Sequence, residues 1–396
     1  MWQWIKNQYH LATALLANIY YRFPSRKLVV IGVTGTDGKT TTVSLIYHIL
    51  KTSGKKASMI SSVGAIIGGK EYDVGFHVTN PASWPLQGFI KKASQASEYL
   101  VLEVTSHGLD QFRVYGVRFN IGVITNITHE HLDYHKTYKN YVKAKAKLLQ
   151  RADLAIVNKD DESYDLINKL LKKKKAVITY GKSKGSDIST DTFPFKTKLI
   201  GEFNTYNCLA AVSVCKQLGI SDADIRKGVE TFEAPIGREE IVYKKDFTVM
   251  IDFAHTPNSF EQVLSALRPL VKKRIIHVFG SAGQRDFTKR PKMGAISAKY
   301  ADVVVLTSED PRTESIDSIM KDIINGIKDA QERMENGTLL IIPNRQEAIA
   351  KAISIAQKGD LVITTGKAHE KSMNYGNGEE PWDEFGAVKK ALEKNI

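Results

Sequence analysis

The chain has 396 residues, of which 42% are hydrophobic and 25% are charged. Domains average about 150 residues, so this length predicts two or three hydrophobic cores and excludes a small stapled scaffold. The balanced composition, with only 11 prolines, excludes a disordered or collagen-like chain. Lys and Arg outnumber Asp and Glu by 56 to 43, a formal net charge of +13. This excess fits an anionic partner, such as a nucleotide, a nucleic acid or a membrane surface, or a merely solubilising surface.

Residues 1–26 are predicted to form an amphipathic helical segment, because Trp2, Trp4, Tyr20 and Tyr21 flank an apolar centre. Such a helix can dock on the first domain, which we favour, or make peripheral contact with a membrane. We expect no membrane span, because no stretch reaches about 18 consecutive apolar residues. A cleavable leader pattern is not recognisable either.

Two cysteines, Cys208 and Cys215, lie in one apolar stretch. Their spacing predicts two buried side chains on one helix rather than a disulfide framework. We therefore expect a cytoplasmic protein.

Short apolar runs alternate with helical patterns along the chain, which predicts an α/β fold with largely parallel sheets. The expected strands form two series, the first at 28–33, 99–104, 121–127 and 154–158, the second at 247–253, 274–280, 301–307 and 361–365. A helical stretch at 204–219 separates the series, and we place a domain boundary near Pro235.

The segment TGTDGKTTT at 34–42 follows an apolar run and precedes a helical pattern. A glycine-rich turn in this setting points backbone N–H groups at an anion, so a nucleotide phosphate is expected here. Lys39 would reach the outer phosphates, and the hydroxyl of Thr40 would hold magnesium. The strict Walker spacing is not met, because Val33 stands where the first glycine belongs. The predicted loop comprises Gly35, Thr36, Asp37, Gly38, Lys39, Thr40 and Thr41.

The stretch NKDD at 158–161 has the spacing that GTPases use to read guanine. A GTPase also needs a D-x-x-G switch, and no glycine stands three residues after Asp73, Asp110 or Asp133. The GTPase interpretation fails on this point.

Polar side chains at the ends of expected strands predict a metal site, since open α/β sheets bind ligands there. Glu103 closes one strand opposite Thr40, and His131 follows another. His129 and His135 lie near His131 and leave zinc as an alternative. A nearby phosphate loop favours magnesium, which prefers oxygen ligands.

Nine motifs together resemble the Mur ligases, most closely the UDP-N-acetylmuramoyl-tripeptide synthetases, over residues 27–396. They are TGTDGKTTT, LEVTSHGLDQFR, TN…HLDYH…AKxxL, GEFNTYN, GREE, DFAHTPNS, GQRDFTKRP, EDPRTE and GKAHEK. The resemblance implies a P-loop-type central ATPase domain at 27–235 and a Rossmann-like α/β domain at 236–396 that binds the incoming amino acid. It also implies ATP-dependent amide-bond formation through an acyl phosphate.

The resemblance assigns catalytic and metal-binding roles residue by residue. Lys39 and Thr40 match the phosphate-loop pair, and Glu103 and His131 match magnesium ligands. Lys145 falls on a lysine that the family carbamylates, which would hold a second magnesium.

Further positions match the family's ATP site. Asn204 and Asn207 match asparagines near the adenine. Arg238 matches an arginine at the domain junction, and Asp252 and His255 match residues that close over the nucleotide.

For a muramoyl-peptide acceptor, the matching positions are Thr79, Asn80, Thr105, Gln111 and Arg113. Asn80 stands where a second threonine is commoner, and Thr105 replaces the usual serine. Both changes keep a side chain that forms hydrogen bonds.

The positions for the incoming amino acid are Arg285, Asp310, Arg312, Gly366 and Glu370. The family's diaminopimelate motif reads Asp-Asn-Pro-Arg, whereas this chain has Glu-Asp-Pro-Arg. Arg312 suits a carboxylate, while the charge of Asp310 suits an ammonium such as that of lysine. Diaminopimelate and L-lysine both stay open, with a slight preference for diaminopimelate.

The family's N-terminal uridine-nucleotide-binding domain has no counterpart in residues 1–26, which leaves the acceptor's head group open. Alternative functions are folate polyglutamylation, ligation to a lipid-linked cell-wall precursor, and a non-catalytic nucleotide-binding partner protein. No motif for reading nucleic acid is found, and we expect a monomer.

Overall fold

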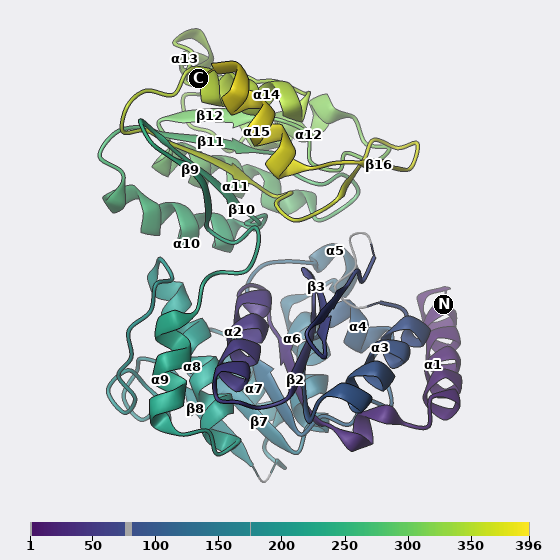
Figure 1. Cartoon of the computed structure of the whole chain (residues 1–396). Coiled ribbons are helices and arrows are strands. Elements are labelled where there is room, and N and C mark those ends of the chain that lie inside the picture. Colours follow the sequence, from purple (N-terminus) through teal and green to yellow (C-terminus); the bar gives the residue numbers. More distant parts are fainter. Residues whose placement is uncertain (1, 76–80, 175, 396) are drawn as a thin grey trace. The chain divides into compact units, whose positions relative to one another are not determined.

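The computed structural model describes residues 2–75, 81–174 and 176–395, and Figure 1 shows its helices and strands. The chain divides into two compact units. The first comprises residues 1–128, 135–199 and 203–233, and the second comprises residues 129–134, 200–202 and 234–396. Among the described residues, no helix has the length and apolar character needed to cross a membrane.

The first unit is built on an eight-stranded sheet in the order β4-β3-β2-β5-β1-β6-β7-β8. Only β3 and β4 run antiparallel to their neighbours among these described strands. The strands are β1 (Val29–Thr34), β2 (Ala57–Ser61), β3 (Gly64–Ile67), β4 (Lys70–Tyr72), β5 (Tyr99–Glu103), β6 (Ile121–Ile124), β7 (Leu154–Asn158) and β8 (Val177–Tyr180).

Helices cover both faces of this sheet, because its central strands are apolar on both sides. Ile31 and Val33 of β1 pack with α2 and α8, whereas Val30 packs on the opposite side with α3. The helices are α1 (Trp2–Tyr20), η1 (Pro24–Lys27), α2 (Lys39–Thr52), α3 (Ser83–Ala96), α4 (Ser106–Asp110), α6 (Tyr138–Arg151), α7 (Tyr164–Leu170), α8 (Glu202–Gln217) and α9 (Asp222–Thr231). A short helix, α5 (Leu132–His135), precedes α6, and its first three residues are grouped with the second unit.

Strand register fixes where a ligand site can form. Val33 pairs with Glu103 of β5, and Thr34 pairs with Ile124 of β6. The carboxyl ends of β1, β5 and β6 therefore lie at one edge, which is where open α/β sheets bind ligands.

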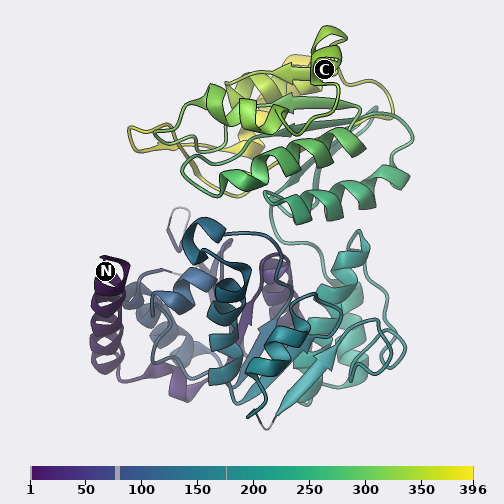
Figure 2. The same cartoon turned by 180° about the vertical axis from the view of Figure 1, so that it is seen from behind.

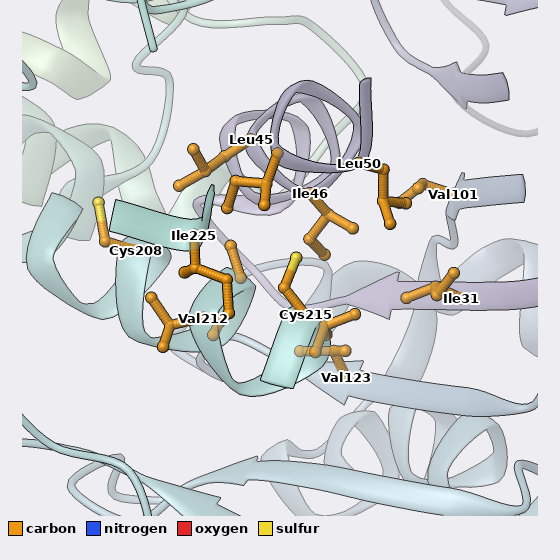
Figure 3. Close-up of a cluster of buried hydrophobic side chains, with 14 of the residues drawn as sticks. Ile31, Leu45, Ile46, Leu50, Val101, Val123, Cys208, Val212, Cys215 and Ile225 are labelled. Carbon is orange, nitrogen blue, oxygen red and sulfur yellow. The ribbon is translucent and has the colours of Figure 1, made fainter. Parts of the chain in front are cut away.

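Helix α8 carries both cysteines, as the sequence predicts, and Figure 3 shows them in the core beside α2. Cys208 and Cys215 are free thiols that are fully buried. Burial raises the pKa of the Cys208 thiol to about 12 and raises that of Cys215 as well. Both side chains act as small apolar core residues.

The second unit contains a six-stranded sheet in the order β13-β12-β11-β14-β10-β9, in which only β9 is antiparallel among the described strands. Its strands are β9 (Glu240–Lys244), β10 (Thr248–Asp252), β11 (Ile275–Phe279), β12 (Val303–Leu306), β13 (Leu339–Ile341) and β14 (Leu361–Thr365), and a separate hairpin contains β15 (Ser372–Asn374) and β16 (Glu379–Pro381). Figure 2 shows the whole chain, including this unit, from behind. The helices of this unit are α10 (Pro257–Leu267), η2 (Arg268–Leu270), η3 (Phe287–Lys289), α11 (Arg290–Tyr300), α12 (Ile316–Ile324), α13 (Ala330–Glu335), α14 (Arg345–Ser354) and α15 (Glu384–Asn395).

Candidate active site

The strand, turn and helix predicted around residues 34–42 are confirmed, with β1 leading through the turn into α2. Helix α2 begins at Lys39, so the N–H groups of its first turn face the loop and can bind an anion. The Lys39 ammonium donates to the carbonyl oxygen of Thr36 at 2.8 Å. This bond folds the lysine back across the turn, where a phosphate would meet it.

At two positions of the loop, neighbouring atoms leave no room for a Cβ, so only glycine fits there. A Cβ on Gly38, whose φ is 77°, would lie 2.2 Å from Asn207 Oδ1. A Cβ on Gly35 would lie 1.7 Å from Thr125 Oγ1. Asn207 in turn donates from Nδ2 to Asn204 Oδ1 at 2.8 Å. The structure therefore places both predicted asparagines of α8 beside the phosphate loop.

Three oxygen atoms gather at the start of α2. Thr40 Oγ1 donates to Glu103 Oε2 at 3.0 Å and lies 2.9 Å from Ser62 Oγ. The Ser62 N–H also donates to Glu103 Oε2 at 3.0 Å. Hydroxyl and carboxylate oxygens are the ligands that Mg²⁺ prefers, and Mg²⁺ typically takes only one or two carboxylates beside substrate phosphates and water. The donor set thus fits magnesium.

Ser62 is a member of this cluster that the sequence analysis missed. It follows the apolar run of β2, which pairs in parallel with β5. Recognising residues 57–61 as a strand would have placed Ser62 next to Glu103. Among the described residues, no group of three or more His, Cys, Asp and Glu could hold a metal ion.

Thr125 and Asn126, which follow β6, brace the phosphate loop. Asn126 Oδ1 accepts from the Asp37 N–H at 2.9 Å, and Thr125 Oγ1 donates to the Asp37 carbonyl oxygen at 2.7 Å. The GTPase-like stretch supports the same turn. Asn158 Nδ2 donates to the Thr125 carbonyl oxygen at 2.9 Å, and Asp161 accepts from the Ile127 N–H at 3.2 Å. Asn158 and Asp161 therefore have a structural role here.

Lys145 of α6 extends to the same loop. Its side chain is 2% exposed, and its ammonium donates to the Gly35 carbonyl oxygen at 2.5 Å. The ammonium also lies 4.5 Å from the ring centroid of Tyr141, whose hydroxyl is 3.2 Å from Thr36 Oγ1. By contrast, Lys143 is exposed and Lys147 forms an ion pair with Asp110.

His135 lies beside Tyr141, but its surroundings disfavour the positively charged form of its imidazole. Burial, followed by the charge of His107, lowers the pKa of His135 to about 4. Its Nε2 is 3.1 Å from Ser106 Oγ. His135 is therefore neutral near pH 7.

The residues predicted for the acceptor lie just before and just after α4, as far as they are described. Thr105 caps this helix by accepting from the Gly108 N–H at 3.0 Å, and Gln111 and Arg113 follow the helix. Thr79 and Asn80 lie outside the described residues.

His131 falls in the segment 129–134, which is grouped with the second unit. Its backbone has a positive φ of 56°, a conformation that is uncommon outside glycine. The role of His131 as a magnesium ligand stays a prediction.

In the second unit, the three residues predicted for the nucleotide lie around Phe253. The Arg238 guanidinium lies 4.4 Å from the Phe253 ring centroid, and His255 packs on the same ring at 4.7 Å. Asp252 accepts from the N–H groups of Glu239 and Ala254 at 2.7 and 2.6 Å.

Two of the residues predicted for the incoming amino acid, Asp310 and Glu370, pair with a buried lysine that the sequence analysis missed. Lys367 is fully buried, and its ammonium lies 3.0 and 3.1 Å from the two carboxylate oxygens of Asp310 and 2.6 Å from Glu370 Oε2. Arg312 Nη1 donates to the Gly283 carbonyl oxygen at 3.2 Å. Asp310 adds a negative charge where the family's motif has asparagine, and the ammonium of Lys367 offsets that charge.

The charges of this cluster are close enough to influence one another. Burial, followed by the charge of Arg312, lowers the pKa of Arg285. Asp310 and Arg312 have positive φ values of 44° and 55°. Strained backbone of this kind persists where the surrounding structure fixes it, commonly at ligand sites.

Glu309, next to Asp310, is buried against Gly366. A Cβ on Gly366 would lie 2.1 Å from Glu309 Oε2. Burial raises the pKa of Glu309 to about 8, although the charges of Lys289, Arg345 and Lys367 oppose that rise.

Comparisons with known proteins agree with this geometry. The chain matches the Mur ligase middle domain over residues 33–215 and the Mur ligase glutamate ligase domain over residues 237–368. UDP-N-acetylmuramoyl-L-alanyl-D-glutamate--2,6-diaminopimelate ligase 1 of Clostridium acetobutylicum is 38% identical over 395 residues, covering 94% of this chain and 80% of that protein. The ligase of the same specificity from Aquifex aeolicus is 37% identical and covers 95% and 80%.

Solved structures give the same result for the fold. A UDP-N-acetylmuramoyl-L-alanyl-D-glutamate--2,6-diaminopimelate ligase has a TM-score of 0.59 at 29% identity, covering 93% of this chain and 78% of that one. Folylpolyglutamate synthase of Mycobacterium tuberculosis has a TM-score of 0.69 at 18% identity, covering 90% and 92%. The second similarity is one of fold alone.

Proposed function

The chain belongs to the Mur ligase family of ATP-dependent, ADP-forming ligases, and we propose that it adds meso-diaminopimelate to a UDP-N-acetylmuramoyl-dipeptide. In the first step a carboxylate of the acceptor attacks the γ-phosphate of ATP, which forms an acyl phosphate and releases ADP. The amine of the incoming amino acid then displaces phosphate and forms the amide bond. We place the reaction in the cytoplasm, where ATP is supplied.

The first step must bring two anions together, the γ-phosphate and the carboxylate, so its main need is positive charge. Lys39 and the first-turn N–H groups of α2 would hold the phosphates. Thr40, Ser62 and Glu103 would hold Mg²⁺, which supplies charge neutralisation between phosphate oxygens. Asn204 and Asn207 lie beside the loop and would position the nucleotide.

Lys145 would act as a carbamate rather than as an ammonium. Unmodified, it donates to a backbone carbonyl that the loop itself presents. Carbamylation would turn this buried cation into a carboxylate on a long stem, able to hold a second Mg²⁺.

The choice of diaminopimelate rests on the charges around Arg312. Diaminopimelate carries a second carboxylate that lysine lacks, and Arg285 and Arg312 offer two guanidinium groups for it. Lys367 pairs with both Asp310 and Glu370. The three cations among these five side chains outnumber the two carboxylates, so the site favours an additional anion over the lone ammonium of a lysine side chain.

One observation supports the proposed activity most directly. The side-chain oxygens of Thr40, Ser62 and Glu103 lie together with Lys39 at the start of α2. ADP release should be measured with ATP, Mg²⁺ and UDP-N-acetylmuramoyl-L-alanyl-D-glutamate, with diaminopimelate, L-lysine or no amino acid. We expect sustained release only with diaminopimelate. Equal release with L-lysine would overturn the amino acid assignment, and no stimulation by either would overturn the acceptor assignment.

A further inference from the structure

Helix α1 presents an apolar stripe to solvent. Ile5, Tyr9, Leu16, Ile19 and Tyr20 recur at intervals of three, four and seven residues, which places them on one face of the helix. Their side chains are 48%, 68%, 58%, 61% and 70% exposed, respectively. We refer to these five residues as the α1 stripe.

The opposite face of α1 is already used for packing. Ala14, Ala17 and Asn18 are fully buried, and α1 packs against α3. Asn18 Nδ2 donates to the Tyr115 carbonyl oxygen at 2.8 Å, which fixes the helix on the first unit. The stripe is therefore the outer face of a docked helix.

The stripe continues onto α3 through an aromatic cluster. The Trp84 ring lies 5.4 Å from the Tyr20 ring and 6.2 Å from the Tyr21 ring, and Trp84 is itself 40% exposed. Figure 1 shows α1 at the edge of the first unit, beside α3. Exposed contiguous apolar side chains of this kind indicate an interaction surface.

The charged side chains of the segment that contains the stripe are all positive. Residues 1–36 contain no Asp or Glu, whereas Lys6, Arg22, Arg26 and Lys27 all lie in this part of the chain. All four side chains are exposed. A second copy of the chain would bring like charges together across such an interface. An anionic lipid surface complements both features, because each nearby Lys or Arg contributes about 1 kcal/mol of attraction.

We propose that the α1 stripe and Trp84 form a peripheral binding surface for anionic membranes. The stripe inserts among the lipid headgroups, with Tyr9, Tyr20 and Trp84 at the interface depth that aromatic rings favour. The cations at both ends of α1 bind lipid phosphates.

The position of this surface bears on the proposed reaction, and this step rests on the proposed function. Arg113, a predicted acceptor residue, lies close to α1, because its carbonyl oxygen accepts from Ser83 Oγ of α3 at 3.3 Å and α3 packs against α1. Membrane binding would hold the acceptor site near the lipid surface.

Vesicle flotation of the full chain tests the proposal. The protein should float with vesicles of phosphatidylglycerol and phosphatidylcholine, and not with phosphatidylcholine alone. Leu16→Glu, which puts a charge in the centre of the stripe, should lower the bound fraction about tenfold or more. Leu270→Glu is the matched control, because Leu270 is 62% exposed in the second unit, and its binding should equal that of the parent chain.

Two results would overturn the proposal. One is failure of the parent chain to float with anionic vesicles. The other is a parent chain that does not float and is a dimer in light scattering, together with a Leu16→Glu variant that is a monomer. That result would make the stripe an interface between two copies of the chain. ADP release with the soluble acceptor should be unchanged in Leu16→Glu. That assay therefore separates failure of the membrane proposal from failure of the proposed function.

Discussion

Lys39 is the residue on which the proposed phosphate binding depends most directly. Lys39→Ala should lower the rate of ADP formation by about 10²–10³-fold, the usual cost of losing one group that stabilises developing charge. Lys51→Ala, at the other end of α2, is the control, because Lys51 is exposed. The rate is measured by coupled ADP detection. A Lys39→Ala enzyme with parental activity would show that the phosphate site lies elsewhere.

Substitution of Lys145 tests whether this side chain acts as a carbamate or as a simple cation. Lys145→Arg keeps the positive charge but cannot be carbamylated, so we expect loss of ligation while folding is retained. Lys143→Arg, on the exposed face of the same helix, should leave ligation unchanged. Ligation is followed by chromatography of the product. Full activity of Lys145→Arg would contradict the carbamate.

Individual site residues were predictable when they followed a recognisable motif. Lys39, Thr40 and Glu103 stand in such motifs, and the structure brings them together. Ser62 and Lys367 were missed, because each acts through partners that are distant in sequence. Lys367 pairs with Asp310 across 57 positions, and only the fold shows that this pair cancels the charge of Asp310.

Helices α14 and α15 are joined by a buried ion pair. Arg345 and Glu384 are both fully buried, and their closest atoms are 2.7 Å apart. Arg345→Met should lower the free energy of unfolding by about 3–5 kcal/mol, because it leaves a buried charge without its partner. Arg268→Met removes a partly exposed pair with Asp302 and should cost about 1 kcal/mol or less. Urea denaturation measures both, and equal losses would contradict this account.

At the scale of elements, strands with uninterrupted apolar runs were predictable. All eight expected strands are present, and the expected 361–365 strand coincides with β14. The short strands β3, β4, β8, β13, β15 and β16 were missed, and so were the five-residue strands β2 and β9. Three or four residues carry too little periodicity for recognition, and neighbouring strands stabilise them in the folded sheet.

For the whole molecule, Glu309 predicts a dependence of stability on pH. Its pKa is raised to about 8, so the folded chain keeps a proton that the unfolded chain releases above about 4.5. Stability from this group is present below pH 4.5 and is lost as pH rises toward 8. Glu309→Gln should therefore reduce the fall in unfolding free energy between pH 5.5 and 8.5, by an amount on the order of a few kcal/mol. The same fall in both proteins would contradict the assignment.

The most direct test of the account is the mass of the product. The chain is incubated with ATP, Mg²⁺, UDP-N-acetylmuramoyl-L-alanyl-D-glutamate and an equal mixture of meso-diaminopimelate and L-lysine, and the nucleotide-linked products are analysed by mass spectrometry. The account predicts an acceptor heavier by one diaminopimelate residue and no such product from Lys39→Ala. A product containing lysine, or an unmodified acceptor after ATP has been consumed, would contradict it.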